Sequence, residues 1–338
     1  SVLSGDLDGH WTGDSGEVRL DGGAAALSLV GARNVLVTGL TFTGAEVGLA
    51  LSDVGAVLVR DCRASENGRG VSAVDASELA LEDCRIHANR FDGVELTGIA
   101  SARFQNNLVY ANGASGIVFH SAVTAMLVRF NTFHANGGDH LREEAPGSSG
   151  AIEDNIFSAG GSGVFDLPNS STLTTERNLV WGNEEAGSDP IVADPAFEDP
   201  DGTDGILGGS GAEDDDFRLR ADSGALDAST LEARAVRLAG REYLAARSSR
   251  ADGLADGSLA DLAAANLGYH VGVPLEPHAA LPAGAERLYI ADGHGPAPRA
   301  LALAAETITG SGAPALGHAA RWTLARRSPL ERPEELVA

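Results

Sequence analysis

Lysine is absent from this chain of 338 residues, so its 24 basic residues are all arginines, against 48 aspartates and glutamates. The formal net charge of −24 repels phosphate backbones, which excludes nucleic acid as an expected partner. Aromatic residues make up only 5%, so a core must be built from Val, Leu, Ile and Ala. No apolar run approaches the ~18 residues of a membrane span, and none is expected.

A secretory signal is also missing at the start of the chain. Ser1 opens within a strand-like stretch, however, as in a processed or truncated chain. The missing signal therefore does not decide where the protein works.

What the sequence has in plenty is glycine, at 43 residues, together with an internal repeat of 22 to 24 residues. Six segments align without gaps, and each has an apolar position between two polar columns that lie five residues apart. The first polar column contains Cys62, Cys84, Asn107, Asn131, Asn155 and Asn178. The apolar column contains Ala64, Ile86, Val109, Phe133, Phe157 and Val180. The second polar column contains Asn67, Asn89, Asn112, Asn136, Gly160 and Asn183.

Each unit alternates apolar and polar residues over short stretches, which is strand periodicity. One unit cannot bury its own apolar side, but stacked units can, with one strand spacing of ~4.8 Å per coil. Stacked asparagines can then hydrogen-bond to one another, and asparagine tolerates the left-handed backbone of tight corners. The Leu-x-x-Leu-x-Leu signature of leucine-rich repeats is missing. The sequence therefore predicts an all-β parallel β-helix of ~22–24-residue coils with a small C-terminal extension.

This repeat resembles the right-handed parallel β-helix superfamily, which includes pectate lyases and C5-epimerases, over roughly residues 20–230. The stretches 194–200, 216–219 and 223–228, and the later residues 266–270, resemble the closing coils of secreted bacterial β-helix proteins. Those proteins usually have proline where this chain has Gly224. The resemblance implies a right-handed solenoid that works outside a bacterial cell, secreted or on its surface. It does not name an activity, because the superfamily has many.

Three regions are predicted along the chain. Residues 1–230 form the β-helix, and residues 231–272 form a closing segment, whose Ala/Arg-rich part at 231–247 suggests a short helix over the open end. Residues 273–338 form a C-terminal extension or docking module, which suggests self-association or membership of a larger assembly.

Cys62 and Cys84 fall in the same column of neighbouring coils. Cα atoms stacked at ~4.8 Å lie within the range of a disulfide, and two buried free thiols that replace the asparagine ladder are the alternative. The acidic stretch 184–216 contains Asp199, Asp201 and Asp204, spaced like part of a calcium loop. Ca²⁺ is the expected cofactor if this is a metal site, and a solvated acidic loop is the alternative.

An outward column lies one residue beyond the apolar column. Stacked rings there suggest a platform for sugar rings, whereas simple strand-to-strand stacking is the alternative. The candidate glycan-binding residues are His87, Tyr110, His134 and Trp181.

The candidate catalytic cluster interrupts the repeat on what reads as a loop, where a base, a cation and acids converge. It consists of Asp139, His140, Arg142 and Glu143. Known lyase, epimerase and glycosidase motifs are missing, and an ordinary polar insertion is the alternative.

Three functions follow. The first is an extracellular or cell-surface structural protein, acting as a fibre, an adhesin or a glycan-binding surface. The second is a lyase or C5-epimerase on an acidic polysaccharide, using His140 and Arg142 with Ca²⁺. The third is a docking subunit of a larger assembly. Whether the protein is an enzyme is not decided by the sequence.

Overall fold

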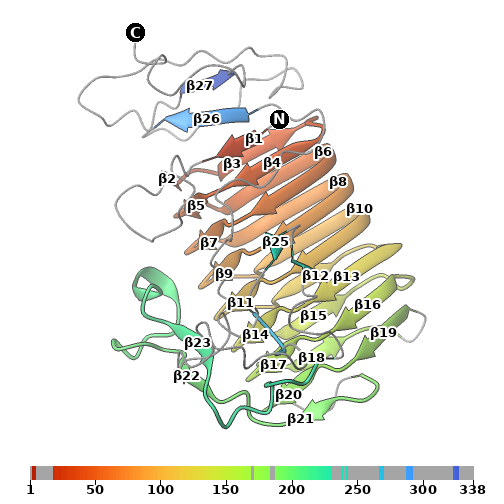
Figure 1. Cartoon of the computed structure of the whole chain (residues 1–338). Coiled ribbons are helices and arrows are strands. Elements are labelled where there is room, and N and C mark those ends of the chain that lie inside the picture. The colour runs from red at the N-terminus through yellow and green to blue at the C-terminus, as the bar shows by residue number, and fades with distance from the viewer. Residues whose placement is uncertain are drawn as a thin grey trace.

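A computed structural model describes residues 2–4, 18–168, 171–182 and 187–229, with the short stretches 237–238, 241–242, 266–269, 287–291 and 323–326. The described chain is almost entirely β-structure. Its strands stack as parallel coils (Figure 1), each with three faces around one core. The predicted fold class is confirmed.

Face A is formed by the first halves of three long strands and by shorter strands that continue them. The long strands are β6 (Val47–Arg60), β8 (Arg69–Glu82) and β10 (Val94–Gln105). They are flanked on face A by β3 (Ala25–Val30), β12 (Ile117–Phe119), β15 (Asp139–Glu143) and β18 (Gly163–Asp166).

Face B is formed by the second halves of the same long strands. They bend at Asp53, Asp75 and Gly98, which have φ between 48° and 68°. Face B continues through β1 (Val2–Ser4), β4 (Val35–Thr38), β13 (Ala125–Arg129), β16 (Ser149–Glu153) and β19 (Thr172–Glu176).

Face C is a separate sheet of short strands. Its order is β2 (Val18–Asp21), β5 (Leu40–Thr43), β7 (Arg63–Ser65), β9 (Arg85–His87), β11 (Leu108–Tyr110), β14 (Thr132–His134), β17 (Ile156–Ser158), β20 (Leu179–Trp181) and β21 (Ile191–Val192).

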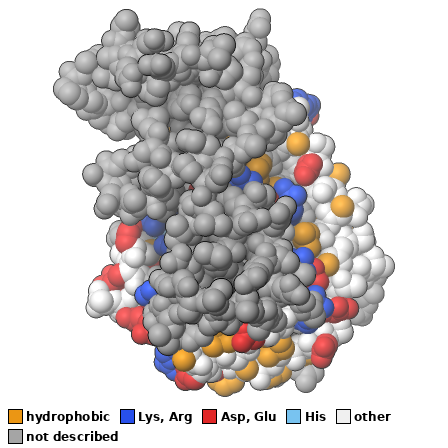
Figure 2. Space-filling view, in the orientation of Figure 1, with side chains coloured by type: hydrophobic (Ala, Val, Ile, Leu, Met, Phe, Trp, Pro, Cys, Tyr) orange, Lys and Arg blue, Asp and Glu red, His pale blue; other side chains and the backbone are white. Residues whose placement is uncertain are grey.

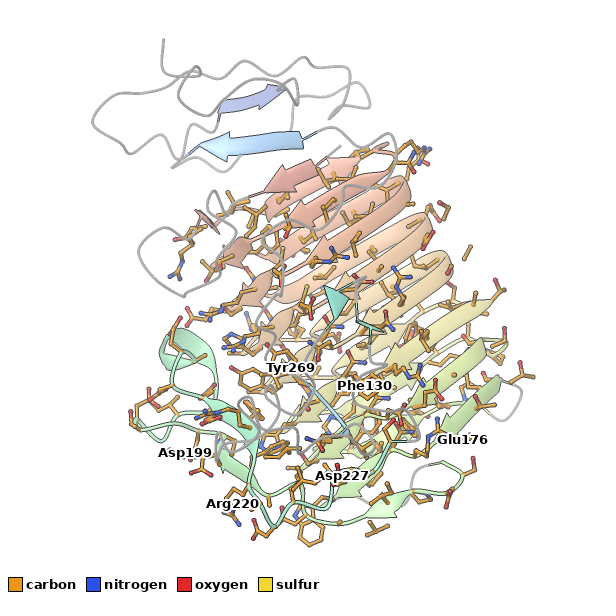
Figure 3. The ribbon with its side chains drawn as sticks, viewed as in Figure 1. Phe130, Glu176, Asp199, Arg220, Asp227 and Tyr269 are labelled. Atoms are coloured by element: carbon orange, nitrogen blue, oxygen red, sulfur yellow. The ribbon has the colours of Figure 1, made fainter. Side chains whose placement is uncertain are left out.

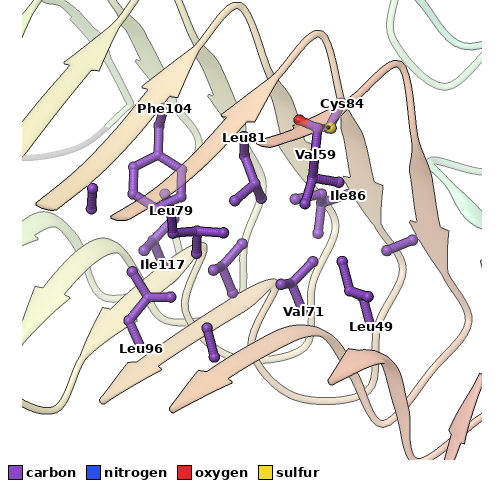
Figure 4. Packing of buried hydrophobic residues seen from close by; sticks show 14 of the residues in the cluster. Leu49, Val59, Val71, Leu79, Leu81, Cys84, Ile86, Leu96, Phe104 and Ile117 are labelled. Atoms are coloured by element: carbon purple, nitrogen blue, oxygen red, sulfur yellow. Dashed lines mark hydrogen bonds between the residues drawn. The ribbon is translucent and has the colours of Figure 1, made fainter. Parts of the chain in front are cut away.

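The core consists of inward-facing residues from all three faces, mostly aliphatic but with phenylalanines such as Phe104 among them (Figure 4). Equivalent residues stack from coil to coil, as Leu49, Val71, Val94 and Ile117 do through the pairing of their strands. Each coil buries the apolar side of the next. Aliphatic residues predominate in this core as predicted, but five phenylalanines also belong to it.

Both asparagine ladders are present and buried. In the first, Oδ1 of Asn131 accepts from the backbone N–H of Asn107 at 2.8 Å and from its side-chain amide at 2.9 Å. Asn155 accepts in the same way from Asn131. The predicted left-handed corners belong to the residues that precede the asparagines, such as Asn106 and Ala111, not to the ladder residues themselves. The ladder asparagines are therefore needed for their amide groups and not for their tolerance of a left-handed backbone.

Cys62 and Cys84 are buried free thiols in the structure. Each sulfur lies where a ladder amide would, and Cys84 Sγ contacts the carbonyl oxygens of Glu82 at 3.3 Å and Val59 at 3.6 Å. Burial raises the pKa of Cys62 to about 12, so this thiol is protonated and unreactive at neutral pH.

The chain turns back over face C after the last coil. The closing residues form β22 (Phe197–Asp199), a 3-10 turn at Gly209–Gly211 and β23 (Asp216–Leu219), which pairs antiparallel with β22. We call residues 194–219 the strap. In Figure 1 it lies beside β11 and β14. A second apolar cluster joins the strap to face C through Tyr110, Phe197 and Phe217.

The closing and C-terminal regions each contain one antiparallel strand pair in their described part. β24 (Arg237–Leu238) pairs with β25 (Arg241–Glu242), so the predicted helix is wrong at these residues. β26 (Arg287–Ala291) pairs in parallel with β1 and antiparallel with β27 (Thr323–Arg326). The remainder of 231–272 and 273–338 lies outside the described residues. No described helix is long and apolar enough to cross a membrane.

Candidate functional site

The predicted catalytic cluster falls on strand β15, not on a loop. Burial separates its members, because Asp139 and Arg142 are partly exposed whereas His140 and Glu143 are buried. Glu143 accepts hydrogen bonds from the backbone N–H of Ser148 and from the hydroxyl of Ser171. The predicted convergence of four groups on one catalytic centre is therefore wrong.

His140 is fully buried in the core and cannot reach a polysaccharide. Its ring packs between Phe133 and Phe157, with centroid distances of 6.1 and 5.8 Å. Burial lowers its pKa to about 3, so the imidazole is neutral, and its Nδ1 lies 3.1 Å from the side-chain amide of Asn136. His140 extends the second asparagine ladder and is a structural residue.

The predicted glycan platform does face outward from the coils, but the strap covers its centre. His87 and Tyr110 are both 0% exposed, and His134 is half-buried. Trp181 is exposed at the last coil. An open platform at His87 and Tyr110 is therefore wrong, because Phe217 of the strap packs on the Tyr110 ring and Gly208 lies against His87.

The acidic turn of the strap uses its carboxylates within the turn. Asp214 Oδ2 accepts from the backbone N–H and the hydroxyl of Thr203, and Asp204 Oδ1 accepts from the N–H of Ile206. Among the described residues, no group of three His, Cys, Asp or Glu is placed to hold a metal ion. Calcium binding by Asp199, Asp201 and Asp204 stays a prediction.

The structure reveals a different constellation on the outer side of face A. Six charged side chains form one continuous line across successive coils, and we call them the charged line. Basic and acidic groups alternate along it, at the distances typical of ion pairs. The line runs Arg69–Glu95 (3.0 Å), Glu95–His120 (2.8 Å), His120–Glu144 (2.7 Å), Glu144–Arg142 (2.7 Å) and Arg142–Asp166 (3.8 Å).

The coil repeat positions these side chains. Glu95 is on β10, and Arg142 pairs with Asp166 between β15 and β18. His120 directly follows β12, and the backbone N–H of Glu144 donates to the carbonyl of Phe119 in the neighbouring coil. The exposed fractions of the side chains range from 23% at Glu95 to 66% at Asp166, so a ligand can reach the whole line.

His120 is the centre of the charged line, since both of its ring nitrogens contact carboxylates. Partial burial opposes the charged form of the imidazole, but hydrogen bonds to Glu144 and Glu95 outweigh it and raise the pKa. The bond to His120 in turn lowers the pKa of Glu144. The imidazole can therefore carry a proton near neutral pH, with both N–H groups donating to carboxylates.

We expect Glu144→Gln to lower the pKa of His120 toward the ordinary value of about 6.5. In the wild type, the stabilisation from this pair is fully present below about pH 6.5 and is lost as the pH rises through the higher pKa of the folded state. NMR titration of the imidazole protons measures both values. Asp166→Asn, at the far end of the line, is the control and should leave the titration unchanged; an equal shift in both variants would contradict this account.

An exposed aromatic ring lies beside the start of the charged line. Phe91 is 42% exposed, and the guanidinium of Arg69 lies 5.5 Å from its ring centroid. Arg90 approaches the same ring at 5.2 Å. Aromatic faces of this kind stack on apolar faces of ligands, while neighbouring cations add hydrogen-bond donors.

The charged line cannot be recognised within any single repeat of the sequence, because its members come from successive coils. Glu95 and His120 are 25 residues apart, and His120 and Glu144 are 24 apart, which is one coil in each case. An alignment of the outward positions of face A, in addition to those of face C, reveals the charged line. Figure 2 shows basic and acidic side chains interspersed on the part of the surface coloured there.

A shallow hollow of about 380 Å³ lies on the neighbouring face B. Small outward residues, including Ser101, Ala125 and Ser149, form part of its lining, together with Glu78 and Arg103. It therefore offers polar contacts on a second exposed surface, across the corner formed by residues 120–124.

Comparisons with known proteins agree with the coil geometry. The family described as "Right handed beta helix region" matches residues 14–133 and 70–191, which together span more than half of the chain. The chain therefore belongs to the right-handed β-helix family, as the resemblance of its repeat implies. Among solved structures, the crystal structure of pectate lyase Pel9A is similar at 14% identity and a TM-score of 0.45, over 63% of this chain and 67% of that chain. No curated protein matches the chain.

Proposed function

We propose that this β-helix protein binds glycans outside the cell, with a linear polysaccharide lying along the coil stack on face A. The charged line carries the proposal, because it provides hydrogen-bonding groups at each coil in the direction of the stack. Five coils, from β8 to β18, span about 19 Å at one strand spacing per coil. Phe91 provides a stacking surface at one end of that span.

Binding is favoured over catalysis by the pairing within the charged line. Each carboxylate has a cation or imidazole partner, and both nitrogens of His120 are engaged. A base that must accept a proton would first have to break these contacts. Extracellular location is supported by the resemblance of the closing segments at 194–200, 216–219 and 223–228 to secreted β-helix proteins.

The test is titration calorimetry with a panel of neutral and acidic oligosaccharides. Arg142→Ala should weaken binding about tenfold, because it removes a charge-assisted hydrogen bond worth about 1.5 kcal/mol. Phe91→Ala should weaken it about fivefold through lost stacking.

Arg33→Ala is the matched control for this titration. It removes an exposed arginine that is also paired with a carboxylate, Asp53 at 3.3 Å, outside the charged line. Affinity should not change in this variant. If no glycan in the panel binds, or if Arg33→Ala and Arg142→Ala weaken binding equally, face A is not a glycan-binding surface.

A polysaccharide lyase or C5-epimerase is the second candidate, favoured by one observation. His120 is a partly exposed imidazole with a raised pKa, and it could donate a proton to a bound substrate. This candidate replaces buried His140 with His120. Proton NMR of a polyuronate panel incubated with the protein, with and without Ca²⁺, would show new unsaturated or epimerised signals that disappear in His120→Gln.

Assembly through residues 273–338 stays a prediction. In the described part of this region, β26 pairs with β1 of the same chain and β27 pairs with β26.

A further inference from the structure

The strap is attached to face C largely by ring packing. Phe217 lies 4.8 Å from the ring of Tyr110 and 5.5 Å from that of His134, measured between centroids. Phe197 contacts His134 edge-on at 5.6 Å. These rings belong to the smaller apolar cluster, apart from the core inside the coils. The strap can therefore separate from face C without disturbing that core.

Polar contacts fix the strap above the same strands. Asp215 Oδ2 accepts from the hydroxyl of Tyr110 at 2.7 Å and from the backbone N–H of Gly208 at 2.8 Å. Glu213 of the strap pairs with Arg63 of face C. In Figure 3, Tyr269 from the later chain lies in front of the coils near these strands, and its ring is 6.0 Å from the guanidinium of Arg85.

The histidines beneath the strap have no carboxylate hydrogen-bonded to them that would stabilise a charge. His87 is 0% exposed, stacks on Tyr110 at 4.8 Å, and neither ring nitrogen has a hydrogen-bond partner. The strap lies directly against it, since a Cβ added to Gly208 would be 3.5 Å from His87 Nδ1. The Nδ1 of His134 is hydrogen-bonded to the Ser158 hydroxyl, which can accept or donate.

We propose that the strap is an acid-released cover, closed over face C while His87 and His134 are neutral and opened when they are protonated. An imidazolium under the closed strap would be a buried charge with no carboxylate on its nitrogens. Opening returns both rings to water. The same event exposes a stripe of Arg63, His87, Tyr110 and His134, and it does not depend on glycan binding at face A.

The charged groups around His87 oppose its protonation. Burial lowers its pKa well below the ordinary value, and Arg63 on the neighbouring coil and Arg85 on the same strand lower it further. Burial lowers the pKa of His134 to about 4, although Asp201 of the strap acts in the other direction. The closed state therefore binds fewer protons than the open state, and its stability is fully present above about pH 6.5 and lost as the pH falls toward 4.

Protonation of the two strap carboxyls that contact face C has opposite effects on the closed state. Burial raises the pKa of Asp215, so its protonation favours the closed state as the pH falls. Pairing with Arg63 lowers the pKa of Glu213 despite its burial, so protonation of Glu213 favours opening. An ordinary carboxyl pKa lies near 4 and that of Glu213 is lower still, so between pH 6.5 and 5 the two histidines favour opening while protonation of Asp215 opposes them. Below about pH 6.5, each histidine lowers the closed-to-open ratio about tenfold per pH unit. At pH 5 the ratio is therefore about 30-fold lower for each histidine than at neutral pH.

The proposal is tested by amide hydrogen exchange of the full chain, measured at several pH values between 7 and 5 and corrected for intrinsic exchange rates. Protection of peptides from 197–217 should fall by up to about 900-fold at pH 5, because each of the two histidines contributes about 30-fold, while peptides from β8 and β10 keep theirs. The double variant His87→Phe/His134→Phe keeps two rings but cannot titrate, and its strap protection should not change with pH. Tyr110→Phe removes the bond to Asp215 and should lower protection equally at all pH values.

The proposal is overturned if wild-type strap protection is independent of pH, or if it falls equally in the double variant. Parallel loss of protection in β8 and β10 would also overturn it, because it would indicate global acid unfolding. If the double variant does not fold, His134→Phe alone should halve the logarithmic slope, and an unchanged slope would contradict the proposal.

Discussion

Asn131→Leu is expected to destabilise the protein by about 2–6 kcal/mol, because it breaks the first asparagine ladder at its centre. The side chain is 0% exposed, and its amide donates to the carbonyl of Phe104 at 2.9 Å. The substitution leaves that carbonyl and the backbone N–H of Asn107 without these partners, and each buried group left unsatisfied costs about 1–3 kcal/mol. Urea denaturation followed by far-UV circular dichroism measures the loss.

Cys84→Asn is the matched control, because it adds an amide to the same column. The thiol already contacts the carbonyl oxygens of Val59 and Glu82, the kind of acceptors that Asn131 uses in its own coil. We expect a change in unfolding free energy below about 1 kcal/mol. Equal losses in Asn131→Leu and Cys84→Asn would show that the column tolerates volume changes poorly and that the amide ladder itself contributes little.

The coil architecture could be predicted because each coil is specified by a short sequence pattern that repeats along the chain. Asn107, Asn131 and Asn155 fall in one column of the sequence and in one hydrogen-bonded ladder of the structure. Stacking places equivalent positions of successive coils next to one another, so residues that are one repeat apart in the sequence are in contact in the structure. The left-handed corners were assigned one residue too late. Beside the second ladder they fall on residues such as Ala111 and Ala135, whose side chains do not indicate that conformation, although Asn106 occupies a corner beside the first.

The functional surfaces could not be predicted in the same way, because they depend on what covers each face. Tyr110 and Trp181 occupy the same outward column, yet the first is fully buried and the second is exposed. The difference comes from the strap, about a hundred residues later in the chain, which returns over β11 but leaves β20 open. Periodicity shows which side of a strand a residue faces and does not show whether another segment lies over it.

The same limit applies to His140. Its neighbours Asp139, Arg142 and Glu143 suggested an exposed polar loop, yet the strand continues through them. The ring fits the core because Phe133 and Phe157 flank it and the Asn136 amide lies against Nδ1. Charged neighbours in sequence therefore did not imply a polar environment in space.

Glu82→Ala is expected to destabilise the protein by about 3–5 kcal/mol, although Glu82 is on the outer side of face B. This carboxylate is 1% exposed and joins two arginines, with Arg60 Nη2 at 2.8 Å and Arg103 Nη2 at 2.9 Å. Removing it takes a counter-charge away from the buried Arg60 guanidinium, and the weaker compensation of a buried charge is the largest cost of breaking such a pair.

Glu153→Ala is the matched control for this prediction. Glu153 lies in the same outward column and also bridges two arginines, Arg129 at 3.2 Å and Arg177 at 2.6 Å, but its side chain is 20% exposed. Because water can replace part of the lost interaction there, we expect a loss of about 1 kcal/mol, measured by urea denaturation at pH 7. Equal losses at the two positions would contradict the argument, since burial is the property that distinguishes them.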